Sequence, residues 1–123
     1  MFDPNNPCLF CNSKQSDSAA ENELAYVSYD TYPVSEFHCL IITKRHVKDY
    51  FDLNDDEVIA CNSLIKKIKE EILLKDITVK GFNIGTNAGK VSGQSILHCH
   101  IHLIPRRECD VKIHKVVLGR LFP

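Results

Sequence analysis

Residues 97–105 read LHCHIHLIP, with a histidine at every second position of the central run and mainly apolar residues between them. Side chains of a β-strand point alternately to its two faces, so a period of two predicts a strand with one face of histidines. We expect this strand to span residues 95–105 and to end at Pro105, because proline cannot donate a ladder hydrogen bond. The histidine face would carry His98, His100 and His102.

The rest of the chain predicts an α+β domain. Two short runs rich in aromatic and β-branched residues, 24–30 and 37–43, are typical of strands, and 79–87 resumes the strand pattern. A helix is predicted to begin after Asn54, with Glu57 at the capping-box position. Its apolar positions are 58, 61, 65, 68 and 72. Strands, a helix and further strands in this order indicate a largely antiparallel sheet with the helix on one face.

The composition is that of a soluble globular protein. Hydrophobic residues make up 44% of the 123 residues, charged residues 25%, and the formal net charge is -1. The chain therefore lacks the basic excess of a dedicated nucleic-acid binder. No apolar run approaches the roughly 18 residues that span a bilayer, and the first residues do not resemble a signal peptide. We expect a cytoplasmic protein with neither nucleic acid nor membrane as a partner.

The six cysteines are expected to be thiols or metal ligands, because disulfides rarely persist in a reducing compartment. Cys39, Cys61 and Cys99 fall within the predicted strands and helix and are interpreted as small core residues. Cys8 and Cys11 form a C-x2-C pair, which supplies two ligands for a zinc ion and requires two more. The alternative is that both are unligated thiols.

Three uses of the histidine face compete: histidines bonded to backbone, three ligands of one metal ion, or a site that handles phosphate. With a rise of about 3.3 Å per residue, the outer two histidine Cα atoms lie about 13 Å apart, so a single zinc would require a strong bend. The spacing favours an extended anion. Imidazole is a nucleophile when neutral and a donor when protonated, and both forms exist near pH 7. The middle residue, His100, is the natural nucleophile.

Polar residues and glycines precede the histidine strand, and basic residues follow it. The loop that contains Asn87, Gly89, Gly93, Gln94 and Ser95 offers N–H, amide and hydroxyl donors for a charged transition state, although a plain turn is the alternative. The basic residues after Pro105 are Arg106, Arg107, Lys112, Lys115 and Arg120. This tail is interpreted as solvated surface or, alternatively, as a contact to an anionic ligand.

Several segments resemble one family. HCHIHLI, residues 98–104, resembles the signature of the histidine triad (HIT) family, and GQS at 93–95 stands where the family has its usual upstream segment. The other matching segments are CLFC at 8–11, YD at 29–30, HCLIITKRHV at 38–47 and IPRR at 104–107. The chain departs from the family pattern in having Thr43 for a proline, and Phe37 and Cys109 for glycines.

The resemblance implies a single HIT domain over residues 1–123, with a sheet of about five strands, one long helix and a short one. It implies a homodimeric hydrolase or transferase that cleaves nucleoside derivatives at the α-phosphate and needs no organic cofactor. His100 matches the family nucleophile, and His102 the histidine that binds phosphate and assists the leaving group. Asp30 and Thr31 match the ribose-binding segment. The phosphate-side loop is matched by Asn87, Gly93, Gln94 and Ser95, and the Ser95 hydroxyl would donate to the bridging atom.

The resemblance also completes a metal site, because some HIT proteins add two histidines to the C-x2-C pair. The implied structural zinc ligands are Cys8, Cys11, His46 and His98. The expected substrate is a dinucleoside polyphosphate or a nucleoside phosphoramidate, and IPRR slightly favours the former. Two alternatives stay open: a nucleotide-binding regulatory protein with incidental turnover, and a metal-dependent hydrolase that uses the three histidines as ligands.

Overall fold

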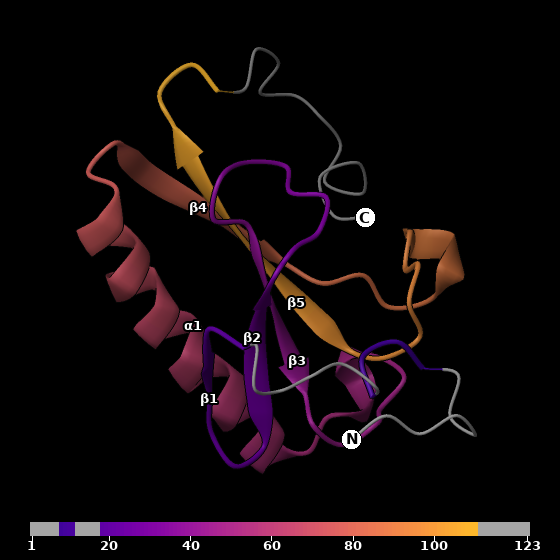
Figure 1. Ribbon diagram of the computed structural model, residues 1–123. Coiled ribbons are helices and arrows are strands. Elements are labelled where there is room, and N and C mark those ends of the chain that lie inside the picture. The colour runs from indigo at the N-terminus through magenta and orange to yellow at the C-terminus, as the bar shows by residue number, and fades with distance from the viewer. Residues whose placement is uncertain (1–7, 12–17, 111–123) are drawn as a thin grey trace.

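The computed structural model describes residues 8–11 and 18–110. In this part of the chain, five strands form one sheet in the order β1-β2-β3-β5-β4, and all neighbouring pairs are antiparallel (Figure 1). The strands are β1 (Ala20–Glu21), β2 (Ala25–Tyr29), β3 (Cys39–Thr43), β4 (Val79–Gly85) and β5 (His100–Arg107). The helical elements are α1 (Asp55–Lys75) and two single turns of 3-10 helix, η2 (Tyr50–Asp52) and η3 (Lys90–Ser92). The predicted α+β class and antiparallel sheet are confirmed.

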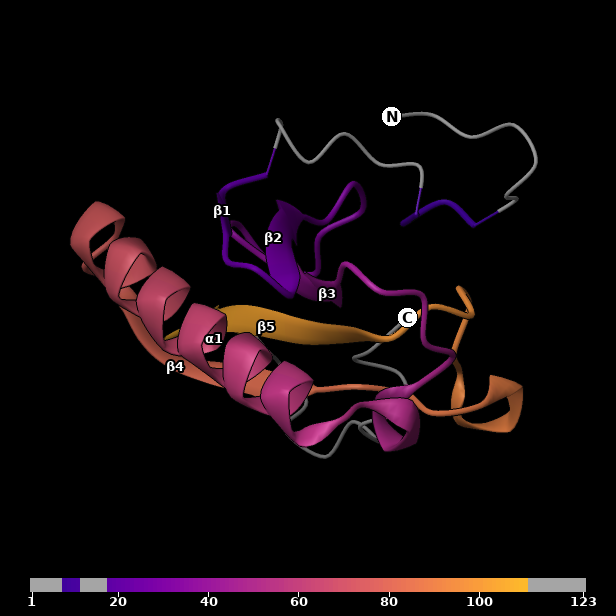
Figure 2. The ribbon, with the colours of Figure 1, turned by 90° about the horizontal axis from the view of Figure 1, so that it is seen from below.

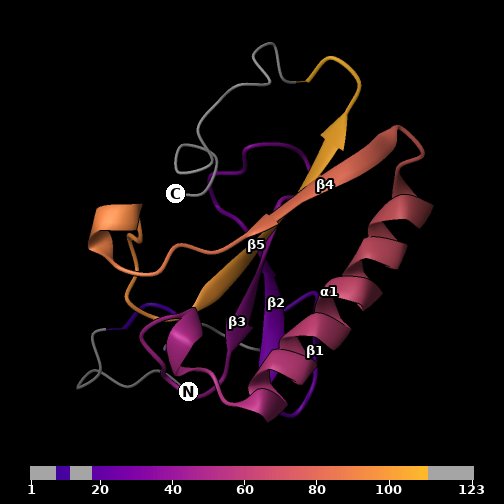
Figure 3. The ribbon, with the colours of Figure 1, turned by 180° about the vertical axis from the view of Figure 1, so that it is seen from behind.

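Helix α1 begins where the sequence predicts. The Asn54 side chain accepts a hydrogen bond from the Glu57 N–H, and the Glu57 carboxylate accepts one from the Asn54 N–H, which completes a capping box. The helix lies along one face of the sheet (Figure 2) and runs diagonally towards the start of β4 (Figure 3). Its buried apolar residues are Cys61, Leu64, Ile68 and Ile72, which pack with β2, β3 and β5 as the main core.

The face of the sheet away from α1 carries the histidines. Across β3 and β5, Leu40 pairs with His102 and Ile42 pairs with His100. Side chains of paired residues lie on the same face, so both histidines sit beside apolar neighbours. Leu40 and Ile42 pack against Phe10 from the N-terminal segment, which lies on the far side of the sheet from the helix (Figure 2). Ile101 and Leu103 face the main core, as the alternation predicts.

The start of β5 differs from the prediction. The strand begins at His100 rather than at residue 95, and His98 lies in the bend before it. The Cys99 N–H in this bend donates to the Val47 carbonyl at 2.7 Å. The three histidines therefore do not form one uniform row, and the turn sends His98 towards a different set of neighbours.

The end of β5 also differs, because the strand continues through Pro105 to Arg107. Strand β3 pairs with β5 only as far as Leu103, whereas β4 still pairs with Pro105 on the other side. The Pro105 carbonyl points to the side that β3 has left, where it accepts a hydrogen bond from Ser35 Oγ at 2.6 Å. An N–H on that side would have no strand partner, so proline removes no ladder bond.

Both described arginines of the IPRR segment form ion pairs. Arg107 donates to Asp76 at 2.9 Å, and Arg106 donates to Asp110 at 3.1 Å. The Arg106 and Arg107 side chains are only 16% and 18% exposed, so both residues are partly buried rather than part of a solvated surface. Lys112, Lys115 and Arg120 lie outside the described residues.

The three cysteines predicted to be core residues are buried. Burial raises the pKa of Cys39 and Cys99 to about 12 and that of Cys61 to about 11. These thiols are therefore protonated and unreactive at neutral pH. Within the described ranges, the model contains no helix with the length and apolar character needed to cross a bilayer.

Two departures from the HIT pattern coincide with unusual backbone. Phe37 and Cys109, each standing where a glycine is common in the family, are the non-glycine residues with positive φ in the described chain, at 71° and 65°. An L side chain in this region costs about 1–2 kcal/mol because its Cβ approaches the backbone. Phe37 also packs against the main core. The fold thus requires a glycine-like conformation at both positions.

Replacing Cys109 by glycine is expected to stabilise the protein by about 0.5–1 kcal/mol, because relief of strain exceeds the added entropy of the unfolded chain. Cys109 is exposed, so little packing is lost. Guanidinium unfolding measures the change. The matched control is Glu108→Gly, at a neighbour without positive φ, which should destabilise by a similar amount. Equal effects of the two substitutions would contradict the assignment of strain to Cys109.

Candidate active site and metal centre

A cavity of about 240 Å³ opens on the histidine face of the sheet. Its polar lining includes His100 and His102 from β5, Asp30 and Thr31 after β2, and Ser95 before β5. Its apolar lining comes from the N-terminal segment, β2 and its following loop, β3, and the approach to β5: Leu9, Phe10, Tyr29, Tyr32, Leu40 and Ile96. Five residues predicted from separate parts of the sequence therefore share one cavity.

His98 is fully buried, and its hydrogen bonds define which ring nitrogen is protonated. Nε2 lies 2.7 Å from the Thr43 carbonyl oxygen. A carbonyl can only accept, so Nε2 carries the proton and Nδ1 presents a lone pair. This Nδ1 lies 3.2 Å from Cys8 Sγ and 3.5 Å from Cys11 Sγ. Burial, the largest influence, lowers the pKa of His98 and so favours the neutral ring that metal binding requires.

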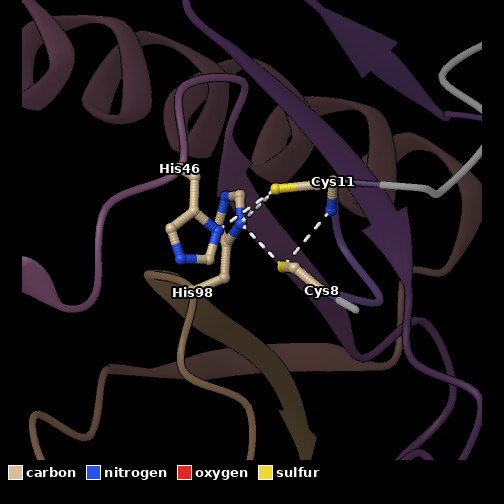
Figure 4. A group of neighbouring side chains, drawn as sticks. All are labelled: Cys8, Cys11, His46 and His98. Atoms are coloured by element: carbon tan, nitrogen blue, oxygen red, sulfur yellow. Dashed lines mark hydrogen bonds between the residues drawn. The ribbon is translucent and has the colours of Figure 1, made fainter. Parts of the chain in front are cut away.

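His46 completes a cluster of four ligands (Figure 4). Its Nδ1 lies 3.2 Å from Cys11 Sγ, and one ligand atom from each of the four residues lies within 4.8 Å of all the others. Two ligands on one tetrahedral zinc, with bonds of about 2.1 Å to nitrogen and 2.3 Å to sulfur, are separated by about 3.5 Å. The donor types, their spacing and the Thr43 bond to the back of His98 all fit a closed Cys2His2 zinc site.

His100 presents the opposite nitrogen from His98. Its Nδ1 lies 2.8 Å from the His98 carbonyl oxygen, so Nδ1 donates and Nε2 holds the lone pair. Burial lowers the pKa of His100, while this hydrogen bond and the Asp30 charge act in the other direction. The ring lines the cavity and is packed edge-on against Phe10. His100 is therefore a neutral imidazole whose lone pair is available for nucleophilic attack.

His102 is oriented through His38. The Val34 N–H donates to His38 Nδ1 at 3.0 Å, so the neutral His38 ring is protonated on Nε2. This Nε2–H donates to His102 Nδ1 at 2.9 Å. His102 consequently carries its own proton on Nε2, which makes that nitrogen a hydrogen-bond donor. His98, His100 and His102 thus differ in their hydrogen bonds: a backbone carbonyl fixes the protonated nitrogen of the first two, and the His38 side chain fixes that of His102.

A second cluster, formed by Asp30, His38 and His102, also has metal-ligand spacing, but its hydrogen bonds oppose metal binding. An ion on His38 Nε2 would move the ring proton to Nδ1, where it would face the Val34 N–H. Asp30 is held in this cluster by the Tyr32 N–H, which donates to Oδ1 at 2.9 Å, and lies 3.4 Å from His38 Nε2. Of the two clusters found among the described residues, the Cys2His2 group therefore has the hydrogen bonding that suits a metal ion.

The hypothesis that all three alternating histidines hold one metal ion is wrong. Among the described residues, neither group with metal-ligand spacing contains more than one of the three, and His100 belongs to neither. The turn before β5 sends His98 to the cysteines, and the strand keeps His100 and His102 at the cavity.

Comparison with known proteins identifies the family. Residues 12–109 match the family model described as the HIT domain. The chain belongs to the HIT family. It is 35% identical over 109 residues to an adenylylsulfatase of Arabidopsis thaliana, a match that covers 85% of this chain and 55% of that protein. It is 30% identical over 103 residues to an adenosine 5'-monophosphoramidase of Schizosaccharomyces pombe, covering 80% and 74% of the two chains.

The HIT fold is also seen in a solved neighbour. The structure of a Zn-bound histidine triad family protein from Mycobacterium smegmatis is similar with a TM-score of 0.77 and 26% identity. The similarity covers 94% of this chain and 89% of that one. The five-stranded antiparallel sheet with one long helix is thus a HIT-like fold.

The loop before the HIT signature is held by Gln94, whose side chain faces inward. Its Oε1 accepts from the Gly89 N–H, and its Nε2 donates to the carbonyls of Lys48 and Ile96. Asn87, Gly93 and Gln94 are not among the residues that line the cavity. Gly93 has a φ of 106°, which explains the glycine. A contact of these three residues with substrate stays a prediction, and for Gln94 the structure shows a role in holding the loop.

Sequence reasoning missed the aromatic wall of the HIT site. Phe10, Tyr29 and Tyr32 line the cavity, but no periodic pattern distinguishes them from ordinary core or surface residues. The sequence did contain a signal for Phe10. It lies between Cys8 and Cys11, so if both cysteines bind a metal together with His98, the Phe10 ring must lie close to the histidine strand. His38, which orients His102, was not singled out by any pattern in the sequence.

Proposed function

We propose that this HIT protein hydrolyses nucleoside derivatives at the α-phosphate through a nucleotidyl-histidine intermediate on His100. The observation that carries the proposal is the His100 tautomer: Nδ1 is bonded to the His98 carbonyl, so the Nε2 lone pair serves as nucleophile in the cavity. The named activities of the plant and yeast relatives, both on adenosine monophosphate derivatives, support this reaction class.

In the first step, His100 Nε2 forms a bond to phosphorus, and the bond from phosphorus to the leaving group breaks with its electron pair on the leaving atom. The leaving atom takes a proton from the Ser95 hydroxyl, which is replenished from solvent, and the His102 Nε2–H donates a hydrogen bond to a non-bridging oxygen. In the second step, water attacks phosphorus and the electron pair of the P–N bond returns to Nε2. Over both steps, water supplies hydroxyl to phosphorus and a proton to the leaving group.

Asp30 and Thr31 would bind the sugar. The Tyr32 N–H donates to Oδ1 of the Asp30 carboxylate, and Oδ2, which lies 3.4 Å from His38 Nε2, would also accept from the hydroxyls of a ribose in the cavity. The apolar and aromatic lining then suits a base. Asn87, Gly93 and Gln94 would act on the phosphate side, Gln94 by holding the loop. His38 is a positioning residue, because it acts through His102.

The test is a panel of adenosine phosphoramidate, adenosine 5'-phosphosulfate and diadenosine polyphosphates. Rapid quenching followed by intact-mass measurement should detect one adenylyl group on the wild-type chain with at least one substrate. Peptide mapping should place the group on His100, and the His100→Ala variant should carry none. Turnover without any trapped adduct, even at the shortest times, would contradict covalent catalysis.

The substrate panel also separates the two expected substrate classes. Neither Arg106 nor Arg107 lines the cavity, since both pair with acidic side chains. The arginines therefore give no support to the slight preference for dinucleoside polyphosphates. The Asp30 carboxylate in the lining disfavours a polyanionic leaving group, whereas the ammonia released from a phosphoramidate carries no negative charge, so we expect the highest kcat/KM for adenosine phosphoramidate.

We further propose that Cys8, Cys11, His46 and His98 hold a structural zinc ion. The fit of the donor set and the zinc-bound neighbour from Mycobacterium smegmatis support this assignment. When bound, zinc would supply a covalent tie between the N-terminal segment and the sheet. Four protein ligands leave no open position on the ion, so catalysis stays with His100 and His102.

A homodimer is proposed from the free edge of β4. In the described sheet β4 is a terminal strand, and beside it α1 and β4 line an apolar cavity of about 320 Å³. Ile59 and Ile84 on its rim are 63% and 57% exposed. A second copy could pair its β4 with this edge and cover the cavity. Light scattering should give a dimer for wild type and Leu74→Asp, a matched exposed position, and a monomer for Ile84→Asp.

A further inference from the structure

Phe10 connects the metal centre to the cavity. In the chain it lies between Cys8 and Cys11, and its side chain lines the cavity. Its ring packs edge-on against the ring of His98, with centroids 5.9 Å apart, and against the ring of His100, with centroids 5.1 Å apart. One aromatic ring therefore contacts a metal ligand, the nucleophile and the space that a substrate would fill.

The segment around Phe10 is held by side-chain packing and by its two cysteines, and the Phe10 ring packs with Tyr26, Leu40 and Ile42. Residues 8–11 belong to no helix or strand of the described structure, so a sheet ladder does not hold them. The Tyr26 hydroxyl donates to the Phe10 carbonyl at 2.8 Å. The two flanking cysteines lie against His98 and His46, which belong to the loops before β5 and after β3. The groups that would bind the metal are thus among the groups that position this part of the cavity wall.

We propose that metal binding by the Cys2His2 cluster controls nucleotide affinity, because the bound metal clamps Phe10 in place as a wall of the cavity. The inference rests on the proposed function, since it takes this cavity as the nucleotide site. Without the metal, the segment has to be ordered when the nucleotide binds, and that ordering free energy weakens binding. His100 and His102 belong to β5, so metal removal should raise KM more than it lowers kcat.

The experiment compares AMP binding to the full chain with one zinc per chain and after removal of zinc by a chelator. Isothermal titration calorimetry should show AMP binding about tenfold weaker to the zinc-free protein, within the roughly 5- to 150-fold span of coupled sites, and restored by added zinc. Coupling is reciprocal, so AMP should tighten zinc binding by the same factor. Circular dichroism identifies whether the zinc-free protein is folded.

Two cavity variants test whether Phe10 is the residue through which zinc changes the affinity for AMP. Phe10→Ala should retain zinc but bind AMP as weakly as the zinc-free wild type, and zinc should change its AMP affinity by less than about twofold. Tyr32→Ala is the matched control, because Tyr32 lines the same cavity but is 85% exposed and lies in a different segment. It should weaken AMP binding equally with and without zinc, leaving the tenfold ratio intact.

The outcomes separate this inference from the proposed function. Equal AMP affinity of folded zinc-loaded and zinc-free wild type would overturn the coupling but leave the nucleotide site in place. No AMP binding to zinc-loaded wild type would instead overturn the proposed function. If removal of zinc unfolds the chain, the test uses the zinc-loaded proteins. An AMP affinity of zinc-loaded Phe10→Ala equal to that of zinc-loaded wild type would then overturn the inference.

Discussion

Replacing His100 by alanine is expected to lower kcat/KM by about 10⁴-fold or more on the best substrate of the panel, because removal of a nucleophile eliminates the covalent route. AMP should still bind, since the aromatic wall, Asp30 and Thr31 are untouched. Steady-state kinetics and calorimetry on the same preparation measure both quantities. The expected pattern is a lost reaction with a preserved binding site.

The same comparison tests the alternative that the chain is a nucleotide-binding regulatory protein with incidental turnover. In that case wild type and His100→Ala would bind AMP alike and turn over substrate at the same slow rate. A suitable control is Thr31→Ala, at an exposed residue of the cavity rim, which should alter KM while kcat stays within about tenfold of wild type.

The free energy of unfolding is expected to fall as the pH drops below about 6.5, the ordinary pKa of histidine. Burial is the largest influence on His38, His98 and His100, and it lowers the pKa of each below the ordinary value of 6.5. Between that value and its folded pKa, each histidine binds a proton only when the chain unfolds. Within that interval, acid therefore favours unfolding by up to about 1.4 kcal/mol per pH unit for each histidine.

Guanidinium unfolding of zinc-free protein at several pH values and constant ionic strength measures this slope. His38→Gln and His100→Gln each remove one titrating group, so each should make the dependence of the unfolding free energy on pH less steep. Buried carboxylates cannot mimic the effect, because the Arg45 hydrogen bond lowers the pKa of Glu57 from 4.5, so its contribution is lost only in more acidic solution. An unchanged slope in both glutamine variants would rule out the buried histidines as its origin.

Local sequence patterns were sufficient for the elements that carry the site. The Asn54 and Glu57 capping box marks the start of α1, and the helix begins there because both residues satisfy backbone groups within one turn. The alternation around His100 places Ile101 on the core side and the histidine on the other, since strand geometry alone decides this. Such features depend on neighbours close in the chain.

The ends of β5 could not be read in the same way. Pro105 is accepted in the strand because β3 stops pairing at Leu103, and the extent of β3 is a property of the assembled sheet. His98 leaves the strand pattern because it lies in a bend where the following residue, Cys99, donates to the carbonyl of Val47, far away in sequence. The single-domain organisation over residues 1–123 and the substrate contacts stay predictions.

The sequence by itself determined the HIT family, the α+β sheet and the residue types available for phosphate and zinc chemistry, because these depend on side-chain identity and short-range periodicity. Tertiary structure alone decided which nitrogen of each histidine is protonated. The Thr43 carbonyl, the His98 carbonyl and the Val34 N–H make that choice, and only folding brings the first and last of them to their histidines. Identical imidazoles thereby receive different chemical roles, since a ring nitrogen can donate or accept but not both.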